Sequence, residues 1–467
     1  MKINTAKPLL LLLLTSIGSL WAQPIPHQIS GIFVDSNQQV TLNLDGSVSN
    51  LVSLPFSISN VFRQMFDLYP VDASPDLANW TRLALLLRTN NAPDPLHYQD
   101  TNNASLGKRF YRTPTNNFIT SFPKPTGRFP VGTSVRVLTD SSRTNRYGLP
   151  TNSSFMCTFW YPADPPGPEQ LPGAYTDAAV ATDRNWFLYW GWPLQWTNLG
   201  ARFVTHTFRD LPLAIGTNRF PVILHSHGWT MDRTLYSQDA TELASHGYIV
   251  AAVDHIDCHA TVFPDPRGAR YLAWPPNFDG AALAQSRVKD IEYLLGHLVE
   301  MDQTDPLLAG RLDLGRTGVM GMSFGGGTAA EVARVAPQVK CAALLEPAIF
   351  SDVYPGLYGE GVQKPFMTVN SSLWTHTNLG VPTPSDYRSM SQTLYSLAST
   401  NATWFYIAGV GHVGGLTDLA WNMEQTPASR PGAVAINASL VWFFDTYLKG
   451  ESPPFPTNSP ITNLKRK

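Results

Sequence analysis

The sequence predicts an α/β fold with a mostly parallel central sheet, preceded by a small all-β sandwich domain. Short apolar runs alternate with amphipathic helical patterns from about residue 119 to 450, which is typical of a parallel sheet covered by helices on both faces. Residues 27–118 instead carry short alternating runs separated by Asn, Asp, Gly, Pro and Ser, and this pattern favours a sandwich of short strands.

Composition excludes several classes of protein. The chain has 467 residues, 43% of them hydrophobic and 15% charged, which suffices for two or three globular domains. The formal net charge is -2 and the one basic run is residues 465–467, so nucleic acid is not an expected partner. The three cysteines, Cys157, Cys258 and Cys341, lack metal-ligand spacing. We expect no metal or other cofactor, leave one disulfide open, and place Cys341 in the core.

Residues 1–22 have the pattern of a cleaved signal peptide. Lys2 and Lys7 accompany a leucine-rich run at 8–17, and the small Ala22 follows as a cleavage point. A membrane anchor is the alternative, but the apolar run is shorter than the ~20 residues that a spanning helix needs. We therefore expect a secreted protein, periplasmic or extracellular.

The predicted β-sandwich module, residues 27–118, is built from short strands. The run QQVTLNLDGS places Val40, Leu42 and Leu44 on one face, and Trp80 is expected in the core. The segments SPDLANWTRLALLLRTNN and RFYR resemble β-sandwich modules that accompany many bacterial exported proteins. We assign this module no chemistry, and the sequence does not identify its partner.

The elements of the α/β part, 119–450, are expected in a regular order. The strands are expected at 222–224, 248–253, 317–322, 341–347, 365–370 and 404–410, the last of these being the final strand. The helices between and after them are expected at 235–245, 282–301 and 435–450. Residues 451–467 are a proline-rich tail, expected to be extended or loose.

The helix expected at 282–301 is strongly amphipathic. Its apolar face is formed by Val288, Ile291, Leu295 and Leu298. Its charged residues, expected largely on the opposite face, are Arg287, Lys289, Asp290 and Glu292.

The run GMSFG, residues 321–325, matches the motif G-x-S-x-G. It follows an apolar strand and precedes an Ala-rich helical pattern, which is the context of a nucleophilic serine on a strand-to-helix turn. On such a turn Gly321 and Gly325 leave room beside Ser323 that a Cβ atom would fill. A phosphate-binding loop is disfavoured because the Lys-Ser/Thr ending is missing. A purely structural glycine-rich turn is the remaining alternative.

A nucleophilic serine needs a histidine base, which in this class of fold follows it in the chain. His376 and His412 follow Ser323. His412 comes directly after the last expected strand, in a loop with glycines at 409, 411, 414 and 415, whereas His376 precedes that strand. We therefore expect His412 to be the base.

The base in turn needs an orienting carboxylate. Many folds of this class place it after the strand expected at 365–370, but no carboxylate occurs there before Asp386. One strand earlier, Glu346 lies at the carboxyl end of the strand expected at 341–347. Glu346 is therefore the expected acid, with Asp352 as the reserve.

The transition state needs hydrogen-bond donors for its oxyanion. The expected donors are the backbone N–H groups of Phe324, directly after the serine, and of Trp229, in the turn HSHGWT. His225 and His227 in that turn could suggest a metal site, but no carboxylate lies at ligand spacing. We expect these two histidines to stabilise the turn by hydrogen bonds.

Several of these segments resemble one known family. HSHGWTMDRTLYSQDATELASHGYIVAAVDHIDCHAT, GMSFGGGTA, PTGRFPVGTSVRVL and CTFWYPAD are similar to the matching parts of the secreted platelet-activating-factor acetylhydrolases, also called lipoprotein-associated phospholipase A2. The resemblance covers about 124–450 and implies an α/β-hydrolase fold. It also implies Ser323 as nucleophile, Glu346 as acid and His412 as base, with Trp229 and Phe324 as oxyanion donors.

The activity implied by the resemblance is calcium-independent hydrolysis of short acyl esters, including the middle position of phospholipids. The sequence departs from the family at three positions: Glu346 stands for the usual Asp, Met322 for a His, and Ile256 for an Arg. These departures put the particular substrate in doubt, but not hydrolysis itself.

The aromatic stretches at 184–196 and 270–278 are suited to lining an apolar substrate site or contacting a lipid surface. They are equally suited to the hydrophobic core or to a lid over the site. The expected partner is a lipid or small ester, with transient contact to a lipid surface left open. Two other functions stay open. One is a general carboxylesterase or polyester hydrolase of the dienelactone-hydrolase-like kind. The other is a non-catalytic surface-binding protein with a degenerate hydrolase domain.

Overall fold

The computed structural model describes most of the α/β part and several strands before it. The described residues are 28–34, 40–45, 66–75, 77, 81–89, 96–100, 110–112, 122–144, 152–167, 170–173, 175, 205–216, 219–264, 269–271, 279–372, 387–399, 401–418, 429–457 and 460–467. Some regions singled out by the sequence lie outside them, namely the signal segment 1–22, Trp80, His376, the aromatic stretch 184–196 and residues 272–278.

The chain divides into two compact units. The smaller is formed by residues 1–53 and 65–117, and the larger by 54–64 and 118–467. The described part of the smaller unit contains two antiparallel three-stranded sheets. Their strands are β1 (Gln28–Val34), β2 (Val40–Asp45) and β5 (Leu96–Asp100), and β3 (Phe66–Ser74), β4 (Thr81–Thr89) and β6 (Phe110–Arg112). The strands are those that the alternating pattern favours, and their packing as a sandwich stays a prediction.

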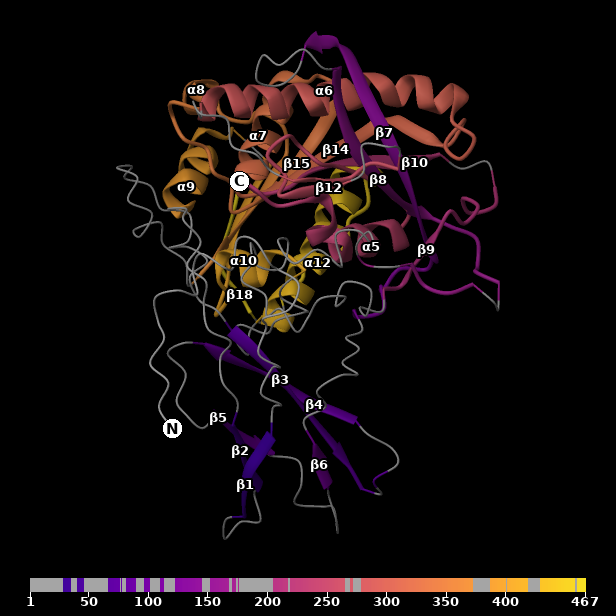
Figure 1. Ribbon diagram of the computed structural model, residues 1–467. Coiled ribbons are helices and arrows are strands. Elements are labelled where there is room, and N and C mark those ends of the chain that lie inside the picture. Colours follow the sequence, from indigo (N-terminus) through magenta and orange to yellow (C-terminus); the bar gives the residue numbers. More distant parts are fainter. Residues whose placement is uncertain are drawn as a thin grey trace, which may run out of the picture. The chain divides into compact units, whose positions relative to one another are not determined.

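A ten-stranded sheet forms the centre of the larger unit (Figure 1). In spatial order its strands are β18 (Ile461–Arg466), β17 (Ala402–Ile407), β16 (Phe366–Ser371), β15 (Val339–Leu345), β14 (Leu312–Met322), β10 (Phe220–Ser226), β11 (Ile249–Val253), β8 (Asn152–Pro162), β7 (Val131–Thr144) and β9 (Thr207–Arg209). The strands from β11 to β17 run parallel, whereas β8 and β18 are antiparallel to their neighbours β11 and β17. This mostly parallel sheet confirms the predicted α/β fold.

Helices cover both faces of this sheet. The helices α6 and α7 pack together on one face, and α5 and α12 pack together on the other (Figure 1). Among the described residues, the helical elements are η3 (Arg233–Tyr236), α5 (Ser237–Ser245), α6 (Gly280–Thr304), α7 (Phe324–Val335), α8 (Pro355–Gly359), α9 (Tyr387–Leu397), α10 (His412–Leu416), α12 (Ser429–Phe444) and the π-helical turn η5 (Asp445–Lys449). A separate two-stranded sheet joins β12 (Ala260–Val262) and β13 (Ala269–Tyr271). Each strand and helix expected between 119 and 450 is therefore present, with shifted ends.

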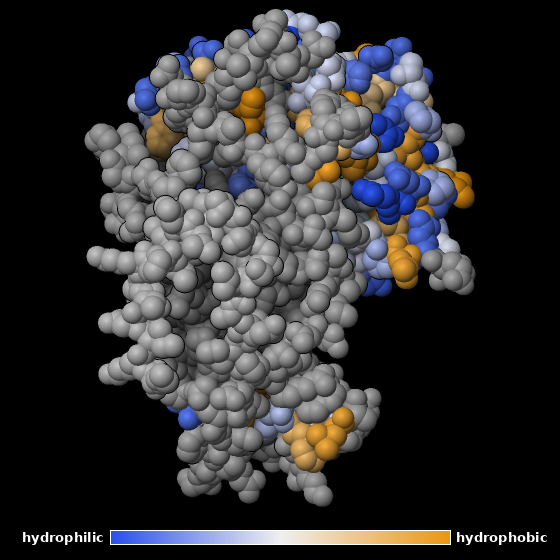
Figure 2. Space-filling model, in the orientation of Figure 1, coloured by the Kyte–Doolittle hydropathy of each residue, from blue (hydrophilic) through white to orange (hydrophobic). Residues whose placement is uncertain are grey.

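The central strands are apolar because both of their faces are covered. Every residue of β10, β11 and β16 is buried, as expected for the inner strands of a parallel sheet. Cys157, Cys258 and Cys341 are buried free thiols, so Cys341 is a core residue as predicted and no disulfide joins the three. On the described surface in Figure 2, hydrophilic and hydrophobic residues are interspersed. Among the described residues, no helix combines the length and apolar character that crossing a bilayer requires.

The predicted charged face of helix α6 is wrong at two positions. Lys289 and Glu292 are exposed, but Arg287 and Asp290 are completely buried. Each buried charge has an ion-pair partner elsewhere in the chain, Asp257 for Arg287 and Arg143 for Asp290. Helical periodicity predicts only which face is apolar. It cannot predict that a charged residue is buried against an ion-pair partner distant in sequence.

The strand expected at 404–410 is not the final strand. The chain continues through the proline-rich segment and returns as β18, which pairs antiparallel with β17. Five of the six residues of β18 are exposed, so it lacks the apolar pattern that signals a strand. Its cations instead lie over buried aromatic rings, with Lys465 4.3 Å from the Trp404 ring centroid and Arg466 5.1 Å from that of Trp442.

The start of helix α5 is capped by a carboxylate from a distant part of the chain. Tyr236, at the N-cap position, makes no side-chain cap. Asp418, just after α10, accepts hydrogen bonds from the N–H groups of Ser237 (2.9 Å) and Gln238 (3.1 Å). A carboxylate there satisfies donors that a helix start leaves open. Burial nevertheless raises the pKa of Asp418 to about 7, against the lowering effect of the hydrogen bond from Ser237.

We expect the free energy of unfolding of the wild type to fall as the pH rises from 5 to 8, and Asp418→Asn to make that fall smaller. The folded-state pKa of Asp418 lies above its unfolded value, so the folded protein binds more protons in this window. The contribution to the free energy of unfolding is therefore present at low pH and lost as the pH rises through about 7. The slope contributed is at most about 1.4 kcal/mol per pH unit. Urea unfolding at each pH measures it.

The matched control for this experiment is Asp279→Asn. Asp279 caps α6 by accepting from the N–H groups of Ala281 and Ala282, but it lies at the surface. Its replacement reports the loss of a capping carboxylate without burial. An Asp418→Asn protein with the pH slope of the wild type contradicts the prediction.

Candidate active site

Ser323 sits on a sharp turn between β14 and α7. Its φ of 56° and ψ of -121° are unusual for a residue with a side chain. The turn is held by main-chain hydrogen bonds: the Ser323 N–H donates to the Leu345 carbonyl (2.9 Å), and its own carbonyl accepts from Gly327 (3.0 Å) and Ala348 (2.8 Å). The strain is therefore fixed by the sheet and helix on either side of it.

Two glycines make this turn sterically feasible. A Cβ atom on Gly321 would overlap the carbonyl group of Gly325. A Cβ atom on Gly325 would overlap the carbonyl oxygens of Ser226 and His227 at the end of β10. The motif thus has glycine at these two positions because main-chain segments approach too closely for a side chain, as the sequence predicts. The same approach presses the serine turn directly against the turn that follows β10.

Glu346 lies at the end of β15 and is completely buried. Its backbone has a φ of 47°, which turns the chain sharply away from the strand. Its Oε2 lies 2.8 Å from Nδ1 of His412. Its Oε1 accepts hydrogen bonds from the N–H (3.1 Å) and hydroxyl (3.0 Å) of Ser371. The reserve residue, Asp352, is exposed.

His412 is the first residue of α10, shortly after β17, and its side chain is buried. The hydrogen bond between its Nδ1–H and Glu346 leaves Nε2 as the ring nitrogen that can accept a proton. The structure therefore brings together the expected base and the expected acid, which are 66 residues apart in the chain.

Tyr387 links this pair to the serine, a role that no sequence pattern predicted. Its hydroxyl oxygen lies 3.2 Å from Oγ of Ser323. Its ring stacks on the His412 ring, with centroids 4.7 Å apart and planes at 26°. Burial raises the pKa of the Tyr387 hydroxyl, so this group stays protonated. A tyrosine at the start of an amphipathic helix carries no sequence signal for such a position.

The two expected oxyanion donors lie on the two turns that press together. Phe324 begins α7 directly after the serine, and Trp229 follows Gly228 in the turn after β10. The Phe324 side chain is buried, whereas that of Trp229 is 36% exposed. Trp229 thus presents an aromatic surface to solvent beside the turn.

The prediction for the two histidines of this turn is right for one of them. His227 Nε2 accepts from the His255 N–H (2.9 Å), and its Nδ1 lies 2.7 Å from the Gly228 carbonyl oxygen. His225 has no hydrogen-bond partner at either ring nitrogen and instead packs on Tyr236, with ring centroids 4.5 Å apart. Burial lowers the pKa of His225 to about 3. Among the described residues, no group of three or more His, Cys, Asp or Glu side chains could hold a metal ion.

Comparison with known proteins supports the resemblance over part of the chain. Residues 190–268 match the model of the family described as platelet-activating factor acetylhydrolase, isoform II. The guinea pig (Cavia porcellus) platelet-activating factor acetylhydrolase is 28% identical over 194 residues, 36% of this chain and 43% of that protein. The dog (Canis lupus familiaris) protein of the same name is 28% identical over 162 residues, 29% of this chain and 36% of its own. The matched regions thus span less than half of these relatives.

Among solved structures, the chain is similar to a ferulic acid esterase from Streptomyces cinnamoneus. The TM-score is 0.57 at 23% sequence identity, and the match covers 73% of this chain and 98% of that one. This likeness concerns the fold. The chain thus has an α/β fold like that of this esterase, and part of its sequence is similar to the platelet-activating factor acetylhydrolases of isoform II.

Proposed function

We propose that this protein is a serine esterase that cleaves short-chain acyl esters through an acyl-enzyme. Ser323 is the nucleophile, His412 the base, Glu346 the orienting acid, and the N–H groups of Trp229 and Phe324 bind the oxyanion. The observation that carries the proposal is the buried cluster at the carboxyl ends of β14, β15 and β17. There a strained serine and a carboxylate-bound histidine both contact Tyr387.

Each group has a defined part in the reaction. The Ser323 oxygen attacks the ester carbonyl carbon while Nε2 of His412 takes the hydroxyl proton. Glu346 holds the ring by Nδ1 and stabilises the imidazolium that forms. The carbonyl oxygen becomes an oxyanion and is bound by the two backbone donors. The alcohol then leaves with the proton from His412, and water repeats the sequence to release the acid.

The glutamate is compatible with this geometry although the family resemblance implies an aspartate at this position. A glutamate has one more rotatable bond than an aspartate, so its carboxylate must be held in one orientation. Ser371 donates two hydrogen bonds to Oε1, which leaves Oε2 directed at the histidine. The chain therefore compensates for the extra methylene by anchoring one carboxylate oxygen.

The proposed substrates are short acyl esters of the phospholipid sn-2 type, and the proposed location is outside the cytoplasm. The substrate class rests on the match over 190–268 to the platelet-activating factor acetylhydrolases. Export rests on the signal pattern of residues 1–22. A general carboxylesterase is the second candidate, favoured by the fold similarity to an esterase. The proposed enzyme needs no metal or cofactor, since its own side chains complete the reaction above.

We expect Ser323→Ala to abolish both hydrolysis of p-nitrophenyl acetate and labelling by a fluorophosphonate probe. Loss of the nucleophile lowers kcat by about 10⁶-fold in well-studied serine hydrolases. The control is Ser396→Ala, which changes an exposed serine on α9 and should keep full labelling. Probe labelling that persists in Ser323→Ala overturns the assignment. A wild type that is neither labelled nor active points to the binding-protein alternative.

We expect Glu346→Gln to lower kcat by about 10³- to 10⁴-fold with little change in KM, because the amide no longer stabilises the imidazolium. Steady-state kinetics on p-nitrophenyl acetate measures the change. Asp352→Asn, at the exposed reserve position, should keep wild-type kinetics. The reverse outcome, an inactive Asp352→Asn beside a normal Glu346→Gln, moves the acid to Asp352.

We expect kcat/KM to be highest for phosphatidylcholines with an acetyl group at sn-2. The value should fall at least about tenfold when that group is replaced by a palmitoyl chain, and a calcium chelator should not alter it. A panel of sn-2 acyl lengths, soluble acyl esters and a polyester film measures the preference. Equal rates on soluble esters, with no response to the lipid headgroup, favour the general carboxylesterase instead.

A further inference from the structure

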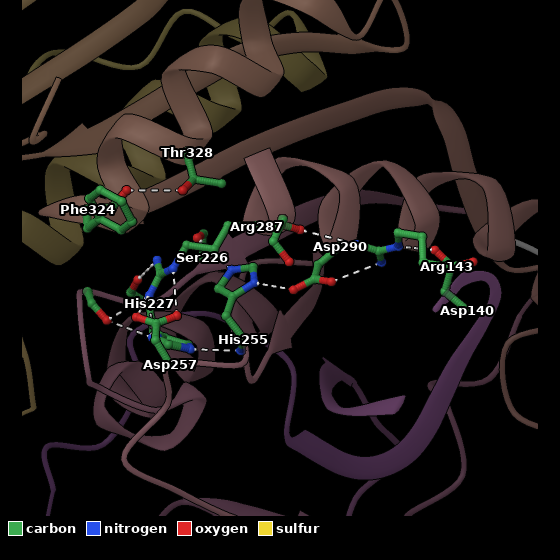
Figure 3. Close-up of polar contacts among 12 residues, drawn as sticks. Asp140, Arg143, Ser226, His227, His255, Asp257, Arg287, Asp290, Phe324 and Thr328 are labelled. Carbon is green, nitrogen blue, oxygen red and sulfur yellow. Dashed lines mark hydrogen bonds and ion pairs between the residues drawn. The ribbon is translucent and has the colours of Figure 1, made fainter. Parts of the chain in front are cut away.

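Arg287 is a fully buried cation beside the predicted oxyanion turn. It lies on α6 and forms a two-pronged ion pair with Asp257, with Nε 2.9 Å from Oδ1 and an outer nitrogen 2.8 Å from Oδ2 (Figure 3). Both side chains are completely shielded from solvent. A buried ion pair is weak evidence for stability, because desolvation offsets most of the attraction. Its presence here therefore calls for another explanation.

The remaining donors of Arg287 hold the turn after β10. One outer nitrogen donates to the carbonyl of His227 (2.7 Å) and the other to that of Gly228 (3.2 Å). The C=O and N–H of a trans peptide point to opposite sides. Because the Gly228 carbonyl faces Arg287, the N–H of Trp229 in the same peptide is directed away from it.

Asp257 fixes the next peptide of the same turn. Its Oδ2 accepts a hydrogen bond from the N–H of Thr230 (3.2 Å). The pair thus holds one peptide by its carbonyl and the following one by its amide hydrogen. The orientation of Trp229 between them is set on both sides.

Arg287 also contacts the second predicted donor residue. Its guanidinium carbon lies 5.1 Å from the centroid of the Phe324 ring, within the range of a cation–π contact. One side chain therefore touches both segments that carry the expected oxyanion donors, the turn after β10 and the first residue of α7.

A second set of contacts fixes the same turn from behind. His255 places one ring nitrogen 2.8 Å from Asp290 and the other 2.8 Å from Ser226, and its main-chain N–H donates to His227 (Figure 3). Asp290 is three residues from Arg287, on the same side of α6, and pairs with Arg143. Burial lowers the pKa of both His227 and His255, so the two rings are neutral near pH 7 and their hydrogen bonds are stable.

We propose that Arg287, paired with Asp257, is the positioning residue of the oxyanion hole. It acts through the backbone: it holds the carbonyls of His227 and Gly228 so that the Trp229 N–H keeps the direction that binds the oxyanion. This inference rests on the proposed function, since it concerns the same reaction. It adds a residue of α6 that lies outside the proposed triad and acts on the oxyanion turn through main-chain carbonyls.

We expect Arg287→Lys to lower kcat about 10²-fold, the lower limit for losing an oxyanion donor, with KM changed less than threefold. Lysine keeps the charge, but its single nitrogen cannot form the two-pronged pair and also reach both carbonyls. The affinity for a trifluoromethyl ketone, which forms an oxyanion in the site, should fall in parallel with kcat/KM. Both are measured on the full chain with p-nitrophenyl acetate as substrate.

The matched control is Arg136→Lys. Arg136 forms the same two-pronged pair with an aspartate, Asp305 (2.9 and 3.3 Å), but donates to no atom of the turn after β10. Its variant should keep the wild-type kcat. If Arg287→Lys fails to fold, the double change Arg287→Met with Asp257→Leu leaves no unpaired buried charge and should show the same loss.

The outcomes separate this inference from the proposed function. A folded Arg287 variant with the wild-type kcat and ketone affinity overturns the inference, even where its melting temperature falls. A loss that appears in KM alone also overturns it. If the wild type has no Ser323-dependent esterase activity, the proposed function fails instead. A fall in kcat and ketone affinity, absent from Arg136→Lys, supports the positioning role.

Discussion

The close approach of two turns is the constraint on which the rest of the site depends. The backbone at Gly325 lies against the carbonyls of Ser226 and His227, at a distance that excludes any side chain. This contact brings the start of α7 to the end of β10, so both expected oxyanion donors lie on adjoining segments. The cost is a serine at positive φ. The parallel strands β10 and β14, which pair up to Ser226 and Gly321, hold that strain.

The same sheet edge explains how residues distant in the chain meet. Parallel strands present their carboxyl ends at one edge, where ligand and catalytic sites of open α/β sheets form. Ser323 follows β14, Glu346 follows β15, and His412 comes shortly after β17. Ser371, at the end of β16, donates two hydrogen bonds to Glu346 at this edge. The proposed acid therefore lies at the same edge as the proposed nucleophile and base.

The fold and the tight turn at Ser323 could be predicted from the sequence because both depend on local patterns. Apolar runs locate the buried strands, and glycine spacing locates a turn that cannot accept a Cβ atom. Other features depend on partners far away in the chain. From the sequence alone, Arg287 is expected at the surface, and its burial depends on the ion pair with Asp257. The segment of β18 is likewise expected to be loose, and it forms a strand because it pairs with β17. Tyr387 likewise becomes notable only beside Ser323.

These distant partners also explain how charge can be buried so close to the proposed reaction centre. An isolated guanidinium in the core would be prohibitively costly, but Asp257 balances Arg287, and Arg143 with His255 surrounds Asp290. The two histidines add donors and acceptors without adding charge, because burial lowers their pKa values. Charge balance thus allows rigid, charge-assisted hydrogen bonds to hold a turn that contains glycine. In the proposed reaction, a turn held in this way has its N–H groups oriented before the oxyanion forms, and preorganisation of this kind is how oxyanion donors lower a barrier.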